Sequence, residues 1–265
     1  MTAIARGVTA IFAPIGARAL TLMATLGGFV VIFGRCIASL FPPRFDRDET
    51  WRNLYRVGVK SYPIVILTAL FTGAILVIQS AFYVKKTGAT GLIGYGVGFS
   101  VFAEIGPILV GLMFSGRVGA NNTAELGTMV VTEQVDALRA LAIDPHTYLV
   151  VPRFIAMMVM LTLLMVLGDL FAVAGAAITS ELLIGLNWRV LIANLLESHL
   201  LDEFIMGIVK AACFGVSISC ISCHYGMTVR GGAVGVGRAV NDSVVASAAG
   251  IFVIDFFVGY LYVVL

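Results

Sequence analysis

Long apolar segments constrain this chain more than any other feature. Residues 61–82 contain no charged side chain over 22 positions, and a helix needs about 20 apolar residues to cross a bilayer. Three further segments each hold one charge: 154–180 with Asp169, 204–229 with Lys210, and 243–265 with Asp255. Only 12% of the residues are charged, against about 25% in a typical soluble domain, so the excess apolar surface must face lipid. The sequence therefore predicts an all-α integral membrane protein.

A fifth span is less regular. Residues 92–116 are apolar but contain Glu104, Pro107 and six glycines. Proline removes a backbone donor from a helix and clashes with the preceding turn. We therefore expect this span to be kinked or broken at a hinge formed by Gly106 and Pro107.

The N-terminal region has a different character from the spans. The apolar stretch 19–34 is only 16 residues long, so it either lies in the membrane interface or enters one leaflet. Residues 42–60 are charged and carry Trp51 and Tyr55, as is typical of a belt at the lipid headgroups. We expect an interfacial elbow region over residues 1–60 and a transmembrane domain over residues 61–265.

The distribution of basic residues predicts the orientation. Residues 1–60 contain eight Lys and Arg side chains, and segments rich in these residues remain on the cytoplasmic side. With five spans, the N-terminus is then cytoplasmic and the C-terminus lies outside. The first residues lack the pattern of a cleavable signal peptide.

The loop between the second and third spans has the pattern of an amphipathic helix over about 122–143. Its polar positions recur every three or four residues: Glu125, Thr128, Thr132, Asp136 and Arg139. Asp144 and Pro145 would end this helix. The segment is acidic, and a helix that binds anionic lipid is normally basic. It is therefore either a docking surface for a protein partner or a solvated linker helix.

Three runs of sequence resemble the hallmark segments of the MlaE/YrbE family, the permease subunits of ABC transporters that move lipids together with MCE proteins. The runs are GRVGANNTAELGTMVVTEQVDALRALAIDPHTYLVVPR (116–153), AEIGPILVGLMFSGRVG (103–119) and KAACFGVSISCISCHYGMTVRGGAVGVGRAVNDSVV (210–245). They occur in the family's order. The motif AVNDSVV (239–245) is more similar to the actinobacterial YrbE branch, in which two different paralogues pair.

The resemblance implies a set of partners. The loop helix would be the coupling helix that contacts a cytoplasmic ABC ATPase, and a second permease chain would complete the membrane core as a homodimer or a paralogous heterodimer. MCE-domain proteins would lie on the outer face of a bacterial inner membrane, with membrane lipid as the substrate. The expected ATPase-coupling residues are Glu125, Thr128, Thr132, Glu133, Gln134, Asp136, Arg139 and Asp144.

Charged residues within the spans are the remaining candidates. A charge at the centre of a span costs roughly 2.5–3.5 kcal/mol on insertion scales, so such residues usually face the bundle interior and pair. We interpret Glu104, Lys210 and Asp255 as candidates for a lipid cavity or gate, and Asp169 as structural. The sequence does not determine which carboxyl groups pair with Lys210.

Catalytic and cofactor motifs are absent from the sequence. It contains no Walker A motif, no HExxH and no GxSxG, so we expect a non-catalytic subunit without a cofactor or metal. The pattern Cys220-x-x-Cys223-His224 matches haem attachment but lies at the end of an apolar span. The net charge of +2 does not indicate nucleic acid. The alternatives are an ion-driven secondary transporter that uses Glu104, Lys210 and Asp255, and a membrane scaffold for an outer assembly.

Overall fold

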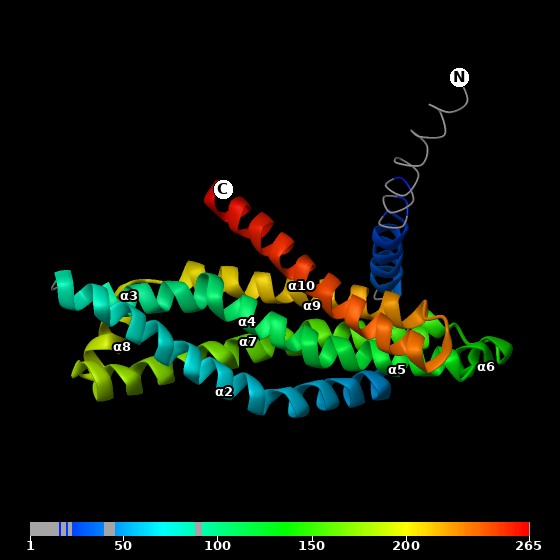
Figure 1. Ribbon diagram of the computed structural model, residues 1–265, viewed down its shortest axis with the longest axis horizontal. Helices are drawn as coiled ribbons and strands as arrows, with labels where there is room; N and C mark the ends of the chain where they lie inside the picture. The colour runs from blue at the N-terminus through cyan, green and yellow to red at the C-terminus, as the bar shows by residue number, and fades with distance from the viewer. Residues whose placement is uncertain (1–15, 17–19, 21–22, 40–45, 88–91, 265) are drawn as a thin grey trace, which may run out of the picture.

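The computed structural model describes residues 16, 20, 23–39, 46–87 and 92–264, which form a bundle of long helices without strands (Figure 1). The α-helices after the N-terminal region are α2 (Arg47–Thr87), α3 (Leu92–Phe99), α4 (Gly106–Phe114), α5 (Ala120–Val131), α6 (Gln134–Ala140), α7 (Val151–Thr179), α8 (Trp188–Glu197), α9 (Leu201–Met227) and α10 (Gly232–Val264). The π-helical segments are η1 (Ser100–Ile105), η2 (Ser115–Gly119), η3 (His146–Val150) and η4 (Ser180–Ile184).

Five helical stretches are long and apolar enough to cross a membrane, which confirms the fold class expected from the sequence. They are Arg47–Phe82, Ile93–Val131, His146–Leu183, Leu201–Met227 and Gly232–Val264. Each is longer than the apolar segment that identified it, because polar helical turns continue beyond the apolar residues.

The first span shows this extension most clearly. Helix α2 begins at Arg47, where the Asp46 carboxylate accepts hydrogen bonds from the backbone N–H groups of Asp48 (2.9 Å) and Glu49 (3.3 Å). Such a side-chain cap satisfies donors that have no partner within the helix. The charged residues that follow are compatible with a helix. The boundary expected at residue 60, between the elbow region and the transmembrane domain, therefore lies inside the continuous helix α2.

The second span is distorted but not broken. Segment η1 leads directly into α4, and the Gly106 N–H donates to the Val101 carbonyl with the wider spacing of a π-helix. Pro107 lies in the first turn of α4, where its missing donor is tolerated. The sequence predicts a kink or break at Gly106 and Pro107. The structure instead has a π-helical segment, η1, directly before these two residues.

The loop helix differs from the expectation. Instead of one helix over 122–143, α5 continues the second span to Val131 and a turn at Thr132 and Glu133 separates it from α6. Glu133 has a φ of 61°, in the left-handed region. The Thr132 hydroxyl bonds back to the Thr128 carbonyl, a local bond that competes with regular helix geometry. The polar stripe expected on one helix is therefore divided between two.

A shorter apolar helix, Met23–Ser39, precedes the bundle and runs across its long axis (Figure 1). The Phe29 ring packs edge-on against His224 of α9, with centroids 5.1 Å apart, and Phe33 packs against Phe154. If the spans follow the membrane normal, this helix lies along the membrane surface. This is the first of the two placements that the sequence allows for residues 19–34. Residues 19, 21 and 22 of the expected segment lie outside the described residues.

Helices α2 and α7 form the most extensive helix–helix contact among the described elements. A Cβ atom at Gly73 of α2 would overlap the Ala172 carbonyl, and one at Gly175 of α7 would overlap the Leu70 carbonyl. The two glycines therefore let the backbones touch. Helix α10 instead leans away toward its C-terminus (Figure 1) and leaves Phe252, Phe256, Phe257 and Tyr260 exposed.

Candidate functional site

Lys210 is the centre of a charged cluster within the spans. Its side chain is fully buried, and its Nζ lies 2.9 Å from Glu104 Oε1 and 2.9 Å from Asp255 Oδ1. Both contacts are ion pairs, and Asp255 Oδ1 has no hydrogen-bond partner. The three residues come from η1, α9 and α10. The structure therefore brings together all three residues that the sequence proposed for a lipid cavity or gate.

The cluster is open on one side. The Glu104 side chain is 44% exposed, whereas Lys210 is fully buried and Asp255 is 15% exposed. Gly259 of α10 lies beside it, and a Cβ atom there would sit 3.8 Å from both Glu104 Oε1 and Lys210 Nζ.

The Ala103 carbonyl completes the environment of Lys210. It accepts a hydrogen bond of 2.9 Å from Lys210 Nζ. Ala103 belongs to η1, and π-helical geometry frequently occurs at functional sites. Sequence reasoning did not identify this acceptor, although the glycine and proline just after it marked the distorted region.

A second polar network lies where the second span emerges. Glu125 accepts from Arg56 of α2 at 3.2 Å and pairs with Arg153 of α7 at 3.4 Å. Arg153 also donates to Asn122 at 3.1 Å. Glu125, expected on the ATPase-coupling surface, is therefore engaged with the first and third spans. Sequence reasoning did not identify Arg56, Arg153 or Asn122 as its partners.

The network continues into the last two spans. The Asn122 amide donates to the Ser222 hydroxyl at 2.8 Å, and the Thr123 hydroxyl lies 2.9 Å from that of Ser243. These two serines belong to α9 and α10. The network therefore joins α5 to α2, α7, α9 and α10. Buried networks whose members are paired tend to act as units.

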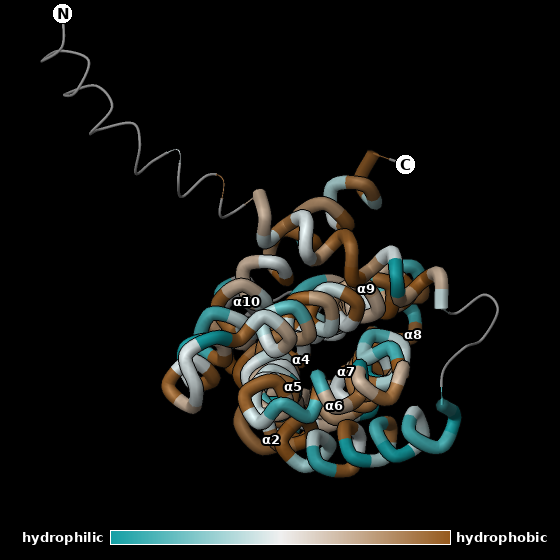
Figure 2. Tube along the Cα trace, turned by 90° about the vertical axis from the view of Figure 1, so that its right-hand side faces the viewer, coloured by the Kyte–Doolittle hydropathy of each residue, from teal (hydrophilic) through white to brown (hydrophobic). Residues whose placement is uncertain are grey.

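The other expected coupling residues lie on the surface at this end of the bundle. Thr128, Thr132, Glu133, Gln134, Asp136, Arg139 and Asp144 are all exposed. Asp136 and Arg139 form an ion pair of 2.8 Å on α6. Figure 2 looks onto this end of the bundle and shows hydrophilic residues on α6. The surface is acidic and accessible, as docking to a partner requires.

Asp144 has a local role as well. Partial burial alone would raise the pKa of its carboxyl group, but hydrogen bonds from the Thr147 hydroxyl and from the N–H groups of His146 and Thr147 outweigh burial. The pKa is therefore held below its ordinary value. The carboxylate caps the helical turn that begins the third span.

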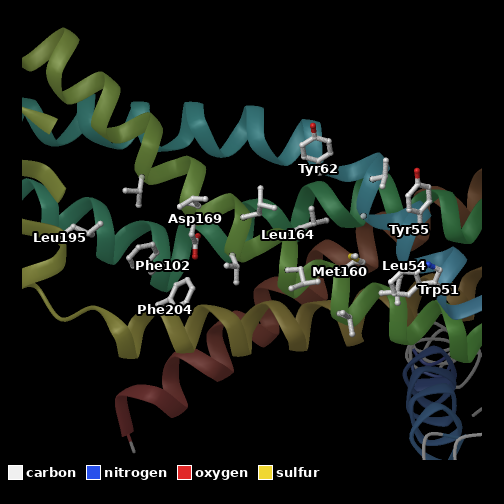
Figure 3. Close-up of a pocket in the computed structure, with 18 residues that line it drawn as sticks. Trp51, Leu54, Tyr55, Tyr62, Phe102, Met160, Leu164, Asp169, Leu195 and Phe204 are labelled. Atoms are coloured by element: carbon white, nitrogen blue, oxygen red, sulfur yellow. The ribbon is translucent and has the colours of Figure 1, made fainter. Parts of the chain in front are cut away.

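Asp169 lies in an apolar groove rather than in a charge pair (Figure 3). It is 2% exposed, and neither carboxyl oxygen has a hydrogen-bond partner. The groove has a volume of about 1060 Å³ and is lined mainly by α2 and α7, with Phe102, Leu195 and Phe204 from neighbouring elements. Asp169 is the only carboxyl group among its lining residues. The sequence interpretation of Asp169 as structural did not anticipate this groove.

The described residues contain no group of three or more His, Cys, Asp or Glu side chains placed to hold a metal. Cys220 and Cys223 are buried free cysteines, and His224 packs against Phe29. This part of α9 packs against the N-terminal helix.

The fold and these sites define a multi-pass helical membrane protein with a charged cluster between its spans and a polar network at one end. The sequence profile described as Permease MlaE matches residues 50–261. The chain belongs to the MlaE permease family.

Individual relatives agree with this assignment. A "Probable ABC transporter permease protein" of Rickettsia felis is 36% identical and covers 94% of this chain and 96% of its own. A similarly named protein of Synechocystis, slr1045, is 37% identical over 86% of this chain and 87% of its own. "Protein TRIGALACTOSYLDIACYLGLYCEROL 1, chloroplastic" of Arabidopsis thaliana is 32% identical over 85% of this chain and 65% of its own. These matches do not test the actinobacterial YrbE branch, which stays a prediction.

Proposed function

We propose that this chain is the permease subunit of an ABC transporter that moves membrane lipids, with ATP hydrolysis in a separate cytoplasmic ATPase. A second permease chain, identical or paralogous, completes the membrane core, and MCE-domain proteins bind the outer face. The membrane is the bacterial inner membrane, with the N-terminus in the cytoplasm and the C-terminus outside. The name of the Arabidopsis relative refers to a glycolipid, which agrees with lipid as the cargo.

The observation that carries this proposal is the connection between the exposed acidic end and the spans. Helix α5 continues the second span, and Glu125 joins it to α2 and α7 through Arg56 and Arg153. A displacement of α6 by a docked ATPase would therefore reach several spans at once. Packed helices and polar networks of this kind carry coupling between distant sites.

The test is a charge reversal on the docking surface. The double variant Glu133→Lys/Asp136→Lys should lose its ATPase in a pulldown from gentle detergent, and lipid movement in vesicles should fall with it. Both residues are exposed, so insertion into the membrane should be unchanged. Surface charges of this kind mainly set partner recognition.

A matched control reverses two exposed acids elsewhere. Glu181 and Glu197 lie in η4 and α8, away from α6 (Figure 1), and Glu181→Lys/Glu197→Lys should keep both the ATPase and lipid movement. An ATPase that co-purifies equally with the two double variants would show that α6 is not the docking site. A wild-type chain that retains no ATPase would contradict the permease proposal.

The charged cluster supports a second candidate, an ion-driven secondary transporter. Lys210, Glu104 and Asp255 lie within ion-pair distance inside the spans, as in a proton relay. Lipid movement that requires a proton gradient, and continues when no ATP is present, would favour this candidate. Lipid movement that requires ATP and is unaffected by an ionophore would favour the permease.

A further inference from the structure

Two carbonyl groups of η1 lack their α-helical donors. The Gly106 N–H donates to the Val101 carbonyl, five residues back, instead of to Phe102, four residues back. Pro107 follows and has no N–H, so it donates to neither Phe102 nor Ala103. Inside a bilayer no water replaces such bonds, and neighbouring helices have to satisfy the backbone groups that a proline frees.

Helix α9 supplies contacts to both carbonyl groups. The Lys210 ammonium donates to the Ala103 carbonyl at 2.9 Å. One turn earlier, a Cβ atom at Gly207 would overlap the Phe102 carbonyl oxygen, so the α9 backbone lies directly against that oxygen. Cα–H groups form weak hydrogen bonds to carbonyls at such helix interfaces. The Phe204 ring, a further turn back, packs edge-on against the Phe102 ring at 5.6 Å (Figure 3). One face of α9 therefore follows η1.

This contact determines where Glu104 lies. Glu104 follows Ala103 in η1, and its carboxylate pairs with the same ammonium group of Lys210 at 2.9 Å. A side chain larger than hydrogen at position 207 would push α9 away from η1 and separate Lys210 from Glu104. Asp255 reaches Lys210 from α10 instead. The Glu104 contact therefore depends on the close approach of α9 to η1, whereas the Asp255 contact does not.

We propose that Gly207 and Pro107 are positioning residues for the Glu104–Lys210 pair. Pro107 frees the two carbonyl groups, and Gly207 lets α9 come close enough for Lys210 to bind one of them. Glu104 is the most exposed member of the cluster, so these two residues set how the cluster is presented at the surface of the spans. The inference rests on the proposed function only for the use of the cluster in transport. Its test measures position, so it can fail or succeed independently of the permease proposal.

Internal amide formation tests this arrangement in the full-length chain. The protein in phosphatidylcholine vesicles is treated with dicyclohexylcarbodiimide, an apolar reagent that activates carboxyl groups. When the Lys210 amine displaces the activated group, an amide forms with Glu104 or with Asp255 and the reagent leaves as its urea. Mass spectrometry of peptides gives the ratio of the two amides. The Asp255 product is the internal reference, and wild type should form both products.

Two single variants change the contact from opposite sides. Gly207→Ala should lower the ratio of the Glu104 product to the Asp255 product about fivefold, the effect of losing one hydrogen bond. Pro107→Ala should lower the ratio as well without any change in α9. In that variant residue 107 regains an N–H, which competes with Lys210 for the carbonyl group four residues back.

Two controls identify the contact that matters. A Cβ atom at Gly96, in α3 of the same span, meets no atom within 4 Å, so Gly96→Ala should keep the wild-type ratio. A Cβ atom at Gly207 would also press against the Met165 methyl group. The double variant Gly207→Ala/Met165→Ala removes that side-chain contact but keeps the overlap with the Phe102 carbonyl, so its ratio should stay low.

Three results would overturn the proposal. The first is a wild-type chain that forms no Glu104 product. The second is an unchanged ratio in Gly207→Ala or, if that variant does not fold, in Pro107→Ala. The third is recovery of the wild-type ratio in Gly207→Ala/Met165→Ala, which would show that Gly207 only makes room for a side chain.

Discussion

At the scale of single residues, Lys210 connects what the sequence suggested with what the structure adds. A lysine inside an apolar span indicates a partner, and here the partners are Glu104, Asp255 and the Ala103 carbonyl. Removing one member of a buried ion pair is far more costly than replacing the whole pair with neutral residues, because the remaining charge stays buried.

Lys210→Met should therefore destabilise the protein, by at most the roughly 3–5 kcal/mol of a fully buried pair, because Glu104 is 44% exposed. The expected result is a lower midpoint of unfolding by denaturing detergent, measured on the purified chain. The triple variant Lys210→Met/Glu104→Gln/Asp255→Asn should recover most of this loss, since no charge is left without a partner.

Lipid movement by the triple variant then distinguishes a structural role of the Lys210 cluster from a role in transport. If the cluster only fixes helix packing, the stable triple variant should move lipid normally. If the cluster acts in lipid movement, the triple variant should be folded and inactive. If Lys210→Met alone unfolds at the same midpoint as wild type, the ion pairs contribute little to stability.

At the scale of elements, the helices match the sequence well where they are apolar and less well where they are polar. The five spans follow from hydrophobic length. The turn at Glu133 does not, because a left-handed glutamate has no sequence signal comparable to glycine. Gly106 and Pro107 identified the distorted part of the second span, but they do not distinguish a π-helical segment from a break.

Asp144 provides a prediction for one element. Its cap on the start of the third span should contribute about 0.5–2 kcal/mol, the usual cost of replacing such a cap with alanine. Because the folded-state pKa is lowered, the contribution of the charged carboxylate is present above the pKa of the unfolded chain and is lost as the pH falls through the folded-state pKa.

Unfolding midpoints of wild type, Asp144→Ala and Asp144→Asn check this expectation. At neutral pH the alanine variant should unfold first. Below the ordinary aspartate pKa, the difference between wild type and the asparagine variant should shrink. A difference that stays constant over this pH range would mean that the charge of Asp144 does not stabilise the helix start.

At the scale of the whole molecule, polar contacts join the helices at the α6 end and, through the Lys210 cluster, within the spans. Apolar contacts join them along the rest of their length. The network around Glu125 connects α2, α5 and α7 and continues to α9 and α10 through Asn122 and Thr123. The exposed aromatic face of α10 is available to lipid or to the proposed second permease chain.

Glu125→Ala tests whether this network transmits movement. Because Glu125 faces Arg56 and Arg153 rather than the exposed surface of α6, the variant should still retain the ATPase in a pulldown. Lipid movement per ATP hydrolysed should fall. Loss of the ATPase from this variant would place Glu125 in the docking surface instead, and unchanged coupling would show that the network is only structural.

The sequence by itself determined that this chain has five segments long and apolar enough to cross a membrane and that it belongs with permeases. Hydrophobic length and family motifs are properties of continuous segments. Only the tertiary structure decided which charges pair and that Asp169 lies without a partner in a groove. Lys210 and Ala103 are 107 positions apart, and the groove combines residues from separate helices. Contacts of this kind depend on how helices pack, which local periodicity does not specify.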